Sequence, residues 1–161
     1  MTHLHPFELT TPIGDADVRV AVNFGWHVFT DEKGNGKPFR WGDGSEDRYF
    51  SPRRHATSYQ AAEFMRERMI AAYVRPCFDK GQNENYFHLD TDDLAIFLAV
   101  HKATEEANFL KCRVISAYEV DRWGREGLPK GRSYKMRYVL DMRNKGHSVN
   151  SIIKAGRNLR R

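Results

Sequence analysis

Two arginines and a histidine, Arg53-Arg54-His55, follow directly on Ser51-Pro52. A Ser-Pro pair is typical of the first residues of a helix, and the main-chain amides at a helix start attract anions. The guanidinium groups add paired donors that fit a phosphate, and an imidazole can move a proton to or from a phosphodiester. The pattern therefore predicts a phosphate-contacting surface at residues 53–55, with a plain basic surface patch as the alternative.

Residues 110–120 and 134–142 both alternate apolar and polar side chains, which is typical of half-buried strands. If these two strands pair with their apolar faces aligned, the other face of the sheet is basic. It would carry Lys111, Arg113, Lys135 and Arg137. A basic sheet face opposite a helix-covered face suits RNA. A solvated face of mixed charge, with Glu119 and Asp141 nearby, is the ordinary alternative.

The net charge of +5 is unevenly distributed along the chain. From residue 130 to the end there are ten basic residues against one acid, Asp141, so that this segment carries +9 and residues 1–129 carry −4. Clustered Lys and Arg side chains release counterions from nucleic acid when they bind it. The basic end therefore adds further candidate contacts, with a solvated tail as the alternative. These candidates are Arg143, Lys145, Lys154, Arg157, Arg160 and Arg161.

A chain of 161 residues with 40% hydrophobic and 29% charged residues fits one soluble domain. No run approaches the roughly 18 apolar residues of a membrane helix, and the first residues lack the basic and apolar parts of a secretory signal. Cys77 and Cys112 have no CxxC spacing, which argues against a disulfide framework and against a zinc site. We therefore expect a cytoplasmic protein that does not contact membranes.

Sequence motifs for metals, cofactors and nucleophiles are missing. A run that imitates a calcium loop begins at Asp43, but Arg48 and Arg54 stand at its sixth and twelfth positions. His55-Ala56-Thr57 matches one half of the paired HxT motif of two-histidine phosphodiesterases, and the second half is absent. No HExxH, P-loop or GxSxG motif occurs. We expect no metal ion and no cofactor, and the pattern favours a protein that is not an enzyme.

The sequence also predicts the elements that position these residues. They are strands at 5–11 and 17–24 around a turn, a long Gly-rich charged loop at 31–48, a helix from Ser51-Pro52 to Arg75-Pro76 with a Thr57–Gln60 capping pair, strands at 85–89, 94–100, 110–120 and 134–142, and a short helix capped by Ser148. This order predicts the α+β class, with an antiparallel sheet, one long helix packed on one face and a short basic C-terminal helix. We expect one domain at 1–145 and a basic helix or tail at 146–161.

Four stretches of the chain resemble a family of small proteins from bacterial prophages and mobile elements. They are Gly25–Thr30, Arg48–His55, Asn85–Phe87 and Val114–Asp121, and the resemblance extends over roughly residues 24–145. It implies no activity, cofactor or partner by itself.

The order of the elements also resembles that of RelE/barnase-like ribonuclease toxins, in which a helix packs on an antiparallel sheet with a catalytic free face. This resemblance implies metal-independent cleavage with Glu119 or His55 as the base, Tyr118 as the acid, and Arg113 or Lys111 stabilising the phosphorane. Strict alternation places Tyr118 on the face opposite Arg113, so that a bulge is needed to bring both to one site.

The sequence favours a phage or mobile-element accessory protein that binds RNA, DNA or a host nucleic-acid-processing complex without catalysis, with anti-defence as its role. One alternative is the RelE/barnase-like ribonuclease. The other is an inhibitor that docks the acidic body of residues 1–129 on a basic host nuclease.

Overall fold

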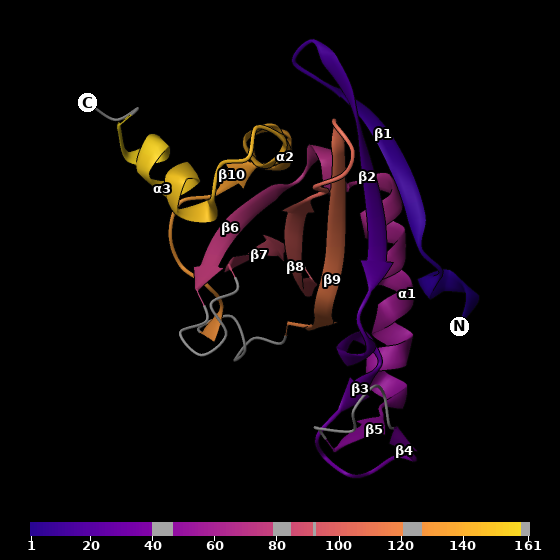
Figure 1. The fold of residues 1–161 in the computed structure, drawn as a ribbon. Coiled ribbons are helices and arrows are strands. Elements are labelled where there is room, and N and C mark those ends of the chain that lie inside the picture. The colour runs from indigo at the N-terminus through magenta and orange to yellow at the C-terminus, as the bar shows by residue number, and fades with distance from the viewer. Residues whose placement is uncertain (40–46, 79–84, 92, 121–126, 159–161) are drawn as a thin grey trace.

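The computed structural model describes residues 1–39, 47–78, 85–91, 93–120 and 127–158 (Figure 1). Its main feature is a curled seven-stranded sheet in the order β1-β2-β9-β8-β7-β6-β10. In that order the strands are β1 Phe7–Ile13, β2 Ala16–Phe24, β9 Phe109–Glu119, β8 Leu94–Lys102, β7 Asn85–Asp90, β6 Tyr73–Phe78 and β10 Tyr134–Lys135. Neighbouring strands are antiparallel except β2 and β9, which are parallel.

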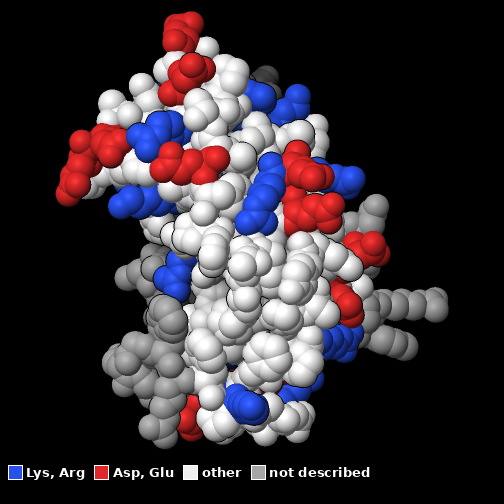
Figure 2. Space-filling model, turned by 90° about the vertical axis from the view of Figure 1, so that its right-hand side faces the viewer, with Lys and Arg blue, Asp and Glu red and all other residues white. Residues whose placement is uncertain are grey.

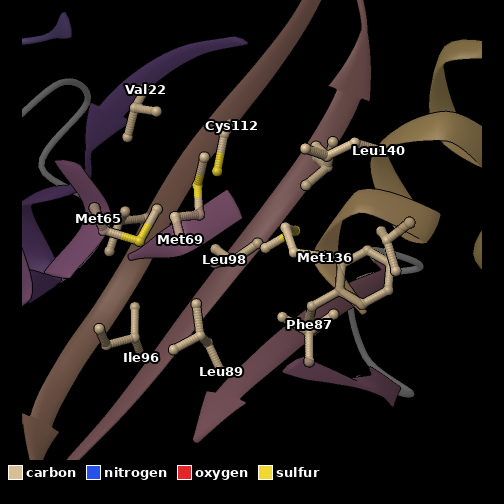
Figure 3. Close-up of a cluster of buried hydrophobic side chains, with 14 of the residues drawn as sticks. Val22, Met65, Met69, Phe87, Leu89, Ile96, Leu98, Cys112, Met136 and Leu140 are labelled. Carbon is tan, nitrogen blue, oxygen red and sulfur yellow. The ribbon is translucent and has the colours of Figure 1, made fainter. Parts of the chain in front are cut away.

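Two layers make up the fold. The helices are α1 Pro52–Glu67, α2 Met136–Asn144 and α3 Val149–Asn158, with short 3-10 turns η1 Thr2–Leu4, η2 Trp26–Val28 and η3 Met69–Ala71. Apolar side chains of α1, η3 and α2 meet those of the sheet in a single buried cluster (Figure 3). It includes Val22, Met65, Met69, Leu98, Cys112, Met136 and Leu140. The predicted α+β class, with the long helix packed on one face, is confirmed.

The start of α1 follows from Ser51-Pro52, as predicted. The Ser51 hydroxyl oxygen accepts the main-chain N–H of Arg54 at 3.4 Å, and Pro52 occupies the first turn, where a missing N–H costs nothing. The predicted Thr57–Gln60 capping pair is wrong, because Thr57 lies inside the helix and its hydroxyl donates to the Arg53 carbonyl at 3.1 Å.

The end of the long helix was predicted too late in the chain. The helix ends at Glu67, and after η3 the chain enters β6, which contains both Arg75 and Pro76. Strand β10 pairs only with Tyr73 and Val74. Within the described residues Pro76 therefore has a strand on one side only, which is where a sheet tolerates the missing N–H.

The predicted strand at 134–142 is wrong as well. Only Tyr134 and Lys135 are extended, and α2 follows. Its apolar residues alternate in sequence, but the buried ones are Met136, Val139 and Leu140, which have the three- and four-residue spacing of a helix face. Lys135 and Arg137 therefore do not extend the basic face of residues 110–120, whose neighbouring strands are β2 and β8.

The predicted loop at 31–48 contains short strands in its described part. A three-stranded sheet in the order β3-β5-β4 is formed by β3 Thr30–Asp31, β5 Arg48–Phe50 and β4 Pro38–Phe39. Arg48 is buried and donates to the Glu32 carboxylate at 2.7 Å and to the Thr30 carbonyl at 3.0 Å. Residues 40–46, with the start of the calcium-like run, lie outside the described residues.

The C-terminal helix α3 agrees with its prediction. The Ser148 hydroxyl oxygen accepts the main-chain N–H of Ser151 at 3.2 Å. Val149 and Ile152 belong to the main buried cluster, so α3 packs on the rest of the chain and is more than a solvated tail. No helix in the described residues is long and apolar enough to cross a membrane.

Candidate nucleic-acid interface

A bulge in β9 decides which side chains share a face of the sheet. Phe97 of β8 lies opposite Ser116 and Leu98 lies opposite Val114, so that Ile115 is an extra residue in β9. An extra residue reverses the inward and outward alternation beyond it. Strand β9 therefore contains the bulge that is needed to bring Arg113 and Tyr118 to the same face of the sheet.

The consequence is visible in the burial of β9. Leu110, Cys112 and Val114 are buried before the bulge and Ala117 is buried after it. Their neighbours project to the other side of the sheet, away from α1 and α2, which we call the outward face. On β9 it carries Lys111, Arg113, Ser116 and Tyr118. Lys111 and Arg113 are exposed, and Tyr118 is half-buried.

A cavity of about 280 Å³ lies where the start of α1 meets β3 and the end of β9. Four of the residues singled out in the sequence line it, two from the helix start and two from β9. The described lining residues are Asp31, Lys33, Ser51, Arg53, Arg54, Thr57, Tyr118 and Glu119. Segments far apart in the chain thus form one cavity with three basic side chains, which we call the α1 cavity.

Arg53 is held at the mouth of this cavity by Glu119. Its Nη2 and Nε donate to Glu119 Oε2 at 2.9 and 3.2 Å. The Arg53 side chain is 72% exposed and that of Glu119 is 48% exposed. An ion pair this open to water contributes little stability, so that the guanidinium can exchange its carboxylate partner for another anion.

Arg54 lies deeper and is fixed by the backbone. Its Nη1 donates to the His27 carbonyl at 2.9 Å, and the side chain is half-buried. Burial lowers the pKa of Arg54, the charge of Arg48 lowers it further, and Asp31 opposes both. A guanidinium keeps its proton at neutral pH in spite of such a shift. The cavity therefore has a permanent positive charge in its wall.

Asp31 and Tyr118 in the cavity wall have different surroundings. The pKa of Asp31 is lowered, first by the main-chain N–H of Lys33 at 2.9 Å, then by the Ser51 hydroxyl and by the charges of Arg54 and Lys33. Burial raises the pKa of Tyr118, and the charge of Arg54 opposes that shift. At neutral pH Asp31 is an anion, whereas Tyr118 is a neutral phenol with an O–H to donate.

His55 faces another part of the molecule. Its ring lies 5.4 Å, centroid to centroid, from each of the rings of Phe50, His3 and Tyr59. It is absent from the described lining of the α1 cavity. Of the residues named for a ribonuclease, Tyr118 and Glu119 therefore lie at the cavity, and His55 lies on the side of α1 that packs against η1. Arg113 and Lys111 lie further along β9, outside the described lining of the cavity.

The remaining basic candidates have structural partners or lie at a distance from β9. Arg143 donates to the carbonyls of Val100 and His147 at 2.9 and 2.8 Å, and Arg137 donates to the Pro12 carbonyl at 2.7 Å. Lys145 pairs with Asp141 at 2.8 Å. Lys135, on β10, and Lys154, on α3, are exposed. Arg160 and Arg161 lie outside the described residues, as does the side chain of Arg157.

The side of the molecule that carries α1 and β1 has both basic and acidic side chains. Figure 2 shows basic and acidic side chains mixed in its upper part and a middle with little charge. Arg19, for example, pairs with both Glu8 and Glu106 at 3.0 Å. This side offers no continuous basic surface in the described residues, so that the outward face of β9 and the α1 cavity remain the best candidates for contact with an anion.

Four aromatic side chains gather on the outward face, a grouping that the sequence did not predict, although it gave Tyr118 as a candidate. They are Tyr86 and His88 from β7, Phe97 from β8 and Tyr118 from β9, which we call the aromatic row. Ring centroids are 6.0 Å apart for Tyr86 and Phe97, 5.0 Å for His88 and Phe97, and 5.9 Å for Phe97 and Tyr118. The alternation of side chains within residues 85–89 and 94–100 indicates which of these residues share a face of their own strand. The row also depends on the register between strands and on the bulge in β9, which the sequence does not show.

The histidine at position 3 makes docking of η1 sensitive to acid. Its ring stacks on Tyr59 at 3.6 Å, its Nε2 lies 2.7 Å from Ser58 Oγ, and its carbonyl accepts Arg66 Nη2 at 2.8 Å. Burial lowers the pKa of His3 from the usual 6.5, and the charges of His55, the amino terminus and Arg66 lower it further. The folded protein thus takes up the proton less readily than the unfolded chain, and stability falls as the pH drops below about 6.5.

We expect His3→Gln to reduce the fall in melting temperature between about pH 7.5 and about pH 5.5, because the group that takes up the proton on unfolding is gone. Thermal unfolding followed by circular dichroism at several pH values measures this. His5→Gln is the matched control, since His5 is exposed. An unchanged pH profile for His3→Gln would contradict the assignment.

Comparison with known proteins identifies a family. A family model described as the YjaZ family matches residues 1–143, which takes in all seven strands of the main sheet, α1 and nearly all of α2. No curated protein matches, and no solved structure matches.

Proposed function

The chain belongs to the YjaZ family, and for this member we propose nucleic-acid binding without catalysis. The contact surface is the basic interface, which we define as Arg53 and Arg54 at the α1 cavity with Lys111 and Arg113 on the outward face of β9. The observation that carries the proposal is the bulge at Ile115, since it puts the basic side chains of β9 on the same face as Tyr118, which lines the cavity.

The chemistry of these four side chains favours a polyanion. Lys111 and Arg113 are exposed, and releasing counterions from phosphates is the main source of affinity for nucleic acid. Arg53 and Arg54 present guanidinium groups, which match phosphate oxygens in pairs. The neighbouring Asp31 and Glu119 interrupt the positive charge of the cavity. Contacts there therefore depend on where each phosphate lies relative to the arginines.

Two alternatives predict different outcomes of the same experiment. The metal-independent ribonuclease is favoured by one observation, the meeting of Tyr118, Glu119 and Arg53 at one cavity. The inhibitor hypothesis places a basic host protein on the acidic body and needs no nucleic acid. The origin in a prophage or mobile element stays a prediction from the resemblance of the sequence. The anti-defence role stays a prediction as well, and the resemblance does not imply it.

The test is binding of the purified protein to labelled RNA and to duplex DNA across a salt series, with the gel also read for cleavage in EDTA. We expect salt-dependent binding without cleavage. The double variant Lys111→Glu/Arg113→Glu should lose about tenfold or more in affinity, and the slope of log K against log salt should shrink by about 2. Arg68→Glu is the matched control, because Arg68 is an exposed residue at the other end of α1.

Each failure points elsewhere. Cleavage in EDTA that is lost in a Tyr118→Phe variant would support the ribonuclease instead. No binding at low salt would overturn the proposal and leave a protein partner as the next hypothesis.

The basic C-terminal end needs a variant that preserves the fold. We expect weaker binding when residues 143–161 are removed, but this truncation also removes Val149 and Ile152 from the core. Neutralising only the basic side chains is the cleaner change, as in Lys154→Ser, Arg157→Ser, Arg160→Ser and Arg161→Ser combined. Unchanged affinity in that variant would restrict the contact to the basic interface.

A further inference from the structure

The aromatic row crosses three neighbouring strands on the outward face, next to the basic interface. Phe97 and Tyr118 lie nearly parallel, with 24° between their planes, and Tyr86 meets Phe97 at 66°. Tyr86, Phe97 and Tyr118 are half-buried, whereas His88 is fully buried beside Phe97. The buried His88 ring therefore packs against the row, and part of each of the other three rings stays accessible.

Tyr118 joins the row to the basic interface. Its phenol lines the α1 cavity with Arg53 and Arg54, and the same strand carries Lys111 and Arg113 on the same face. A base resting on Tyr118 would thus have guanidinium groups on both sides along the sheet to receive its phosphates. Partly accessible aromatic rings next to cations on a sheet face are what an unpaired nucleotide chain binds.

We infer that the occupant of this face is single-stranded nucleic acid, with at least one base stacked on Tyr118 or Phe97. The inference rests on the proposed nucleic-acid binding and adds a requirement to it. Apart from the outer faces of the two end pairs, the faces of bases in a duplex are covered by their neighbours, so that stacking on protein rings along a strand is open only to unpaired bases. Charge alone would bind single strands and duplexes with no such distinction.

The experiment compares one oligonucleotide as a single strand and as a blunt duplex, at one salt concentration, with RNA and DNA versions in separate arms. We expect the protein to prefer the single strand. Tyr118→Leu should reduce affinity for the single strand by about tenfold, in line with the loss of one stacked base, and leave affinity for the duplex unchanged. Tyr118→Phe keeps the ring and should keep the preference.

Tyr59→Leu is the matched control, because Tyr59 is 52% exposed and lies on α1, in contact with His3. Phe97→Leu tests the second ring, and circular dichroism checks that each variant folds. Photocrosslinking of a 5-bromouridine-labelled strand, followed by mass spectrometry, should place the crosslink on the peptide that contains Tyr118.

The two proposals fail in different ways. Equal binding of single strand and duplex, unchanged by Tyr118→Leu, would overturn the stacking inference and leave nucleic-acid binding in place. Absence of binding to either form at low salt would overturn the proposed function itself.

Discussion

Val139→Lys is expected to lower the free energy of unfolding by about 3–5 kcal/mol, because it leaves a buried charge without a partner. Val139 is 0% exposed and lies in the main cluster with Met136 and Leu140, on the face of α2 that meets the sheet. Urea denaturation of the variant and the parent protein measures the difference, and a large drop in melting temperature should accompany it.

Two control variants separate the helix from the strand that alternation predicts. In a strand Val139 and Arg137 would share the polar face, and replacing either would cost little. In α2 Val139→Ala should cost on the order of 1–3 kcal/mol through the lost contacts and the cavity. Arg137→Ala should cost less, since Arg137 is exposed and loses one hydrogen bond to Pro12. Similar stabilities for all three variants would contradict the helix.

The error at 134–142 has a simple physical cause. Met136, Tyr138, Leu140 and Met142 alternate with polar residues, and Tyr138 and Met142 are only partly buried at the border of the core. A helix can place apolar residues at its border without changing the alternation seen in sequence. Val139 was the informative residue, because a helix buries it together with its neighbour Leu140, whereas a strand with one solvated face would not.

The fold class was predictable because its main signals are local. The Val18, Val20 and Val22 series, the apolar run at 94–100 and the Ser51-Pro52 helix start each depend on a few neighbouring residues, and all three reappear in the structure. The parallel pairing of β2 with β9 joins segments about 90 residues apart, and strand order of that kind has no local signal.

The candidate site was predictable to a similar extent. Arg53 and Arg54 lie at the helix start, where the sequence placed them, and Lys111 and Arg113 lie exposed on one face of a strand. The joining of these two groups through Tyr118 depends on the extra residue at Ile115. A bulge has no reliable sequence signature when the residue is not glycine, so alternation alone assigned Tyr118 to the wrong face.

Cys112 is expected to react with iodoacetamide at least about 1,000-fold more slowly in the folded protein than in the urea-unfolded chain. It is 0% exposed in the middle of β9, and burial raises the pKa of its thiol from 9.0 to about 12. At about pH 8 this shift alone lowers the thiolate fraction by about three orders of magnitude, and the thiolate is the form that reacts. Peptide mapping by mass spectrometry over time gives the two rates.

Cys77 provides the internal comparison for this measurement. Burial raises the pKa of its thiol to about 11, and the thiol donates to the Arg75 carbonyl at 3.5 Å. It lies on β6, close to the edge of the sheet, where local opening is easier than in the centre. We therefore expect Cys77 to react before Cys112, and equal rates would contradict the placement of β9 at the centre.

The two predictions can be combined, because reaction at Cys112 requires the core to open. When opening and closing are fast compared with alkylation, the rate at Cys112 follows the population of the open form. A loss of about 3–5 kcal/mol in the Val139→Lys variant should then raise that rate by about two to nearly four orders of magnitude, provided that the variant remains folded. A rate that stays at the parent value while urea denaturation shows the loss would mean that Cys112 and Val139 do not belong to one cooperative core.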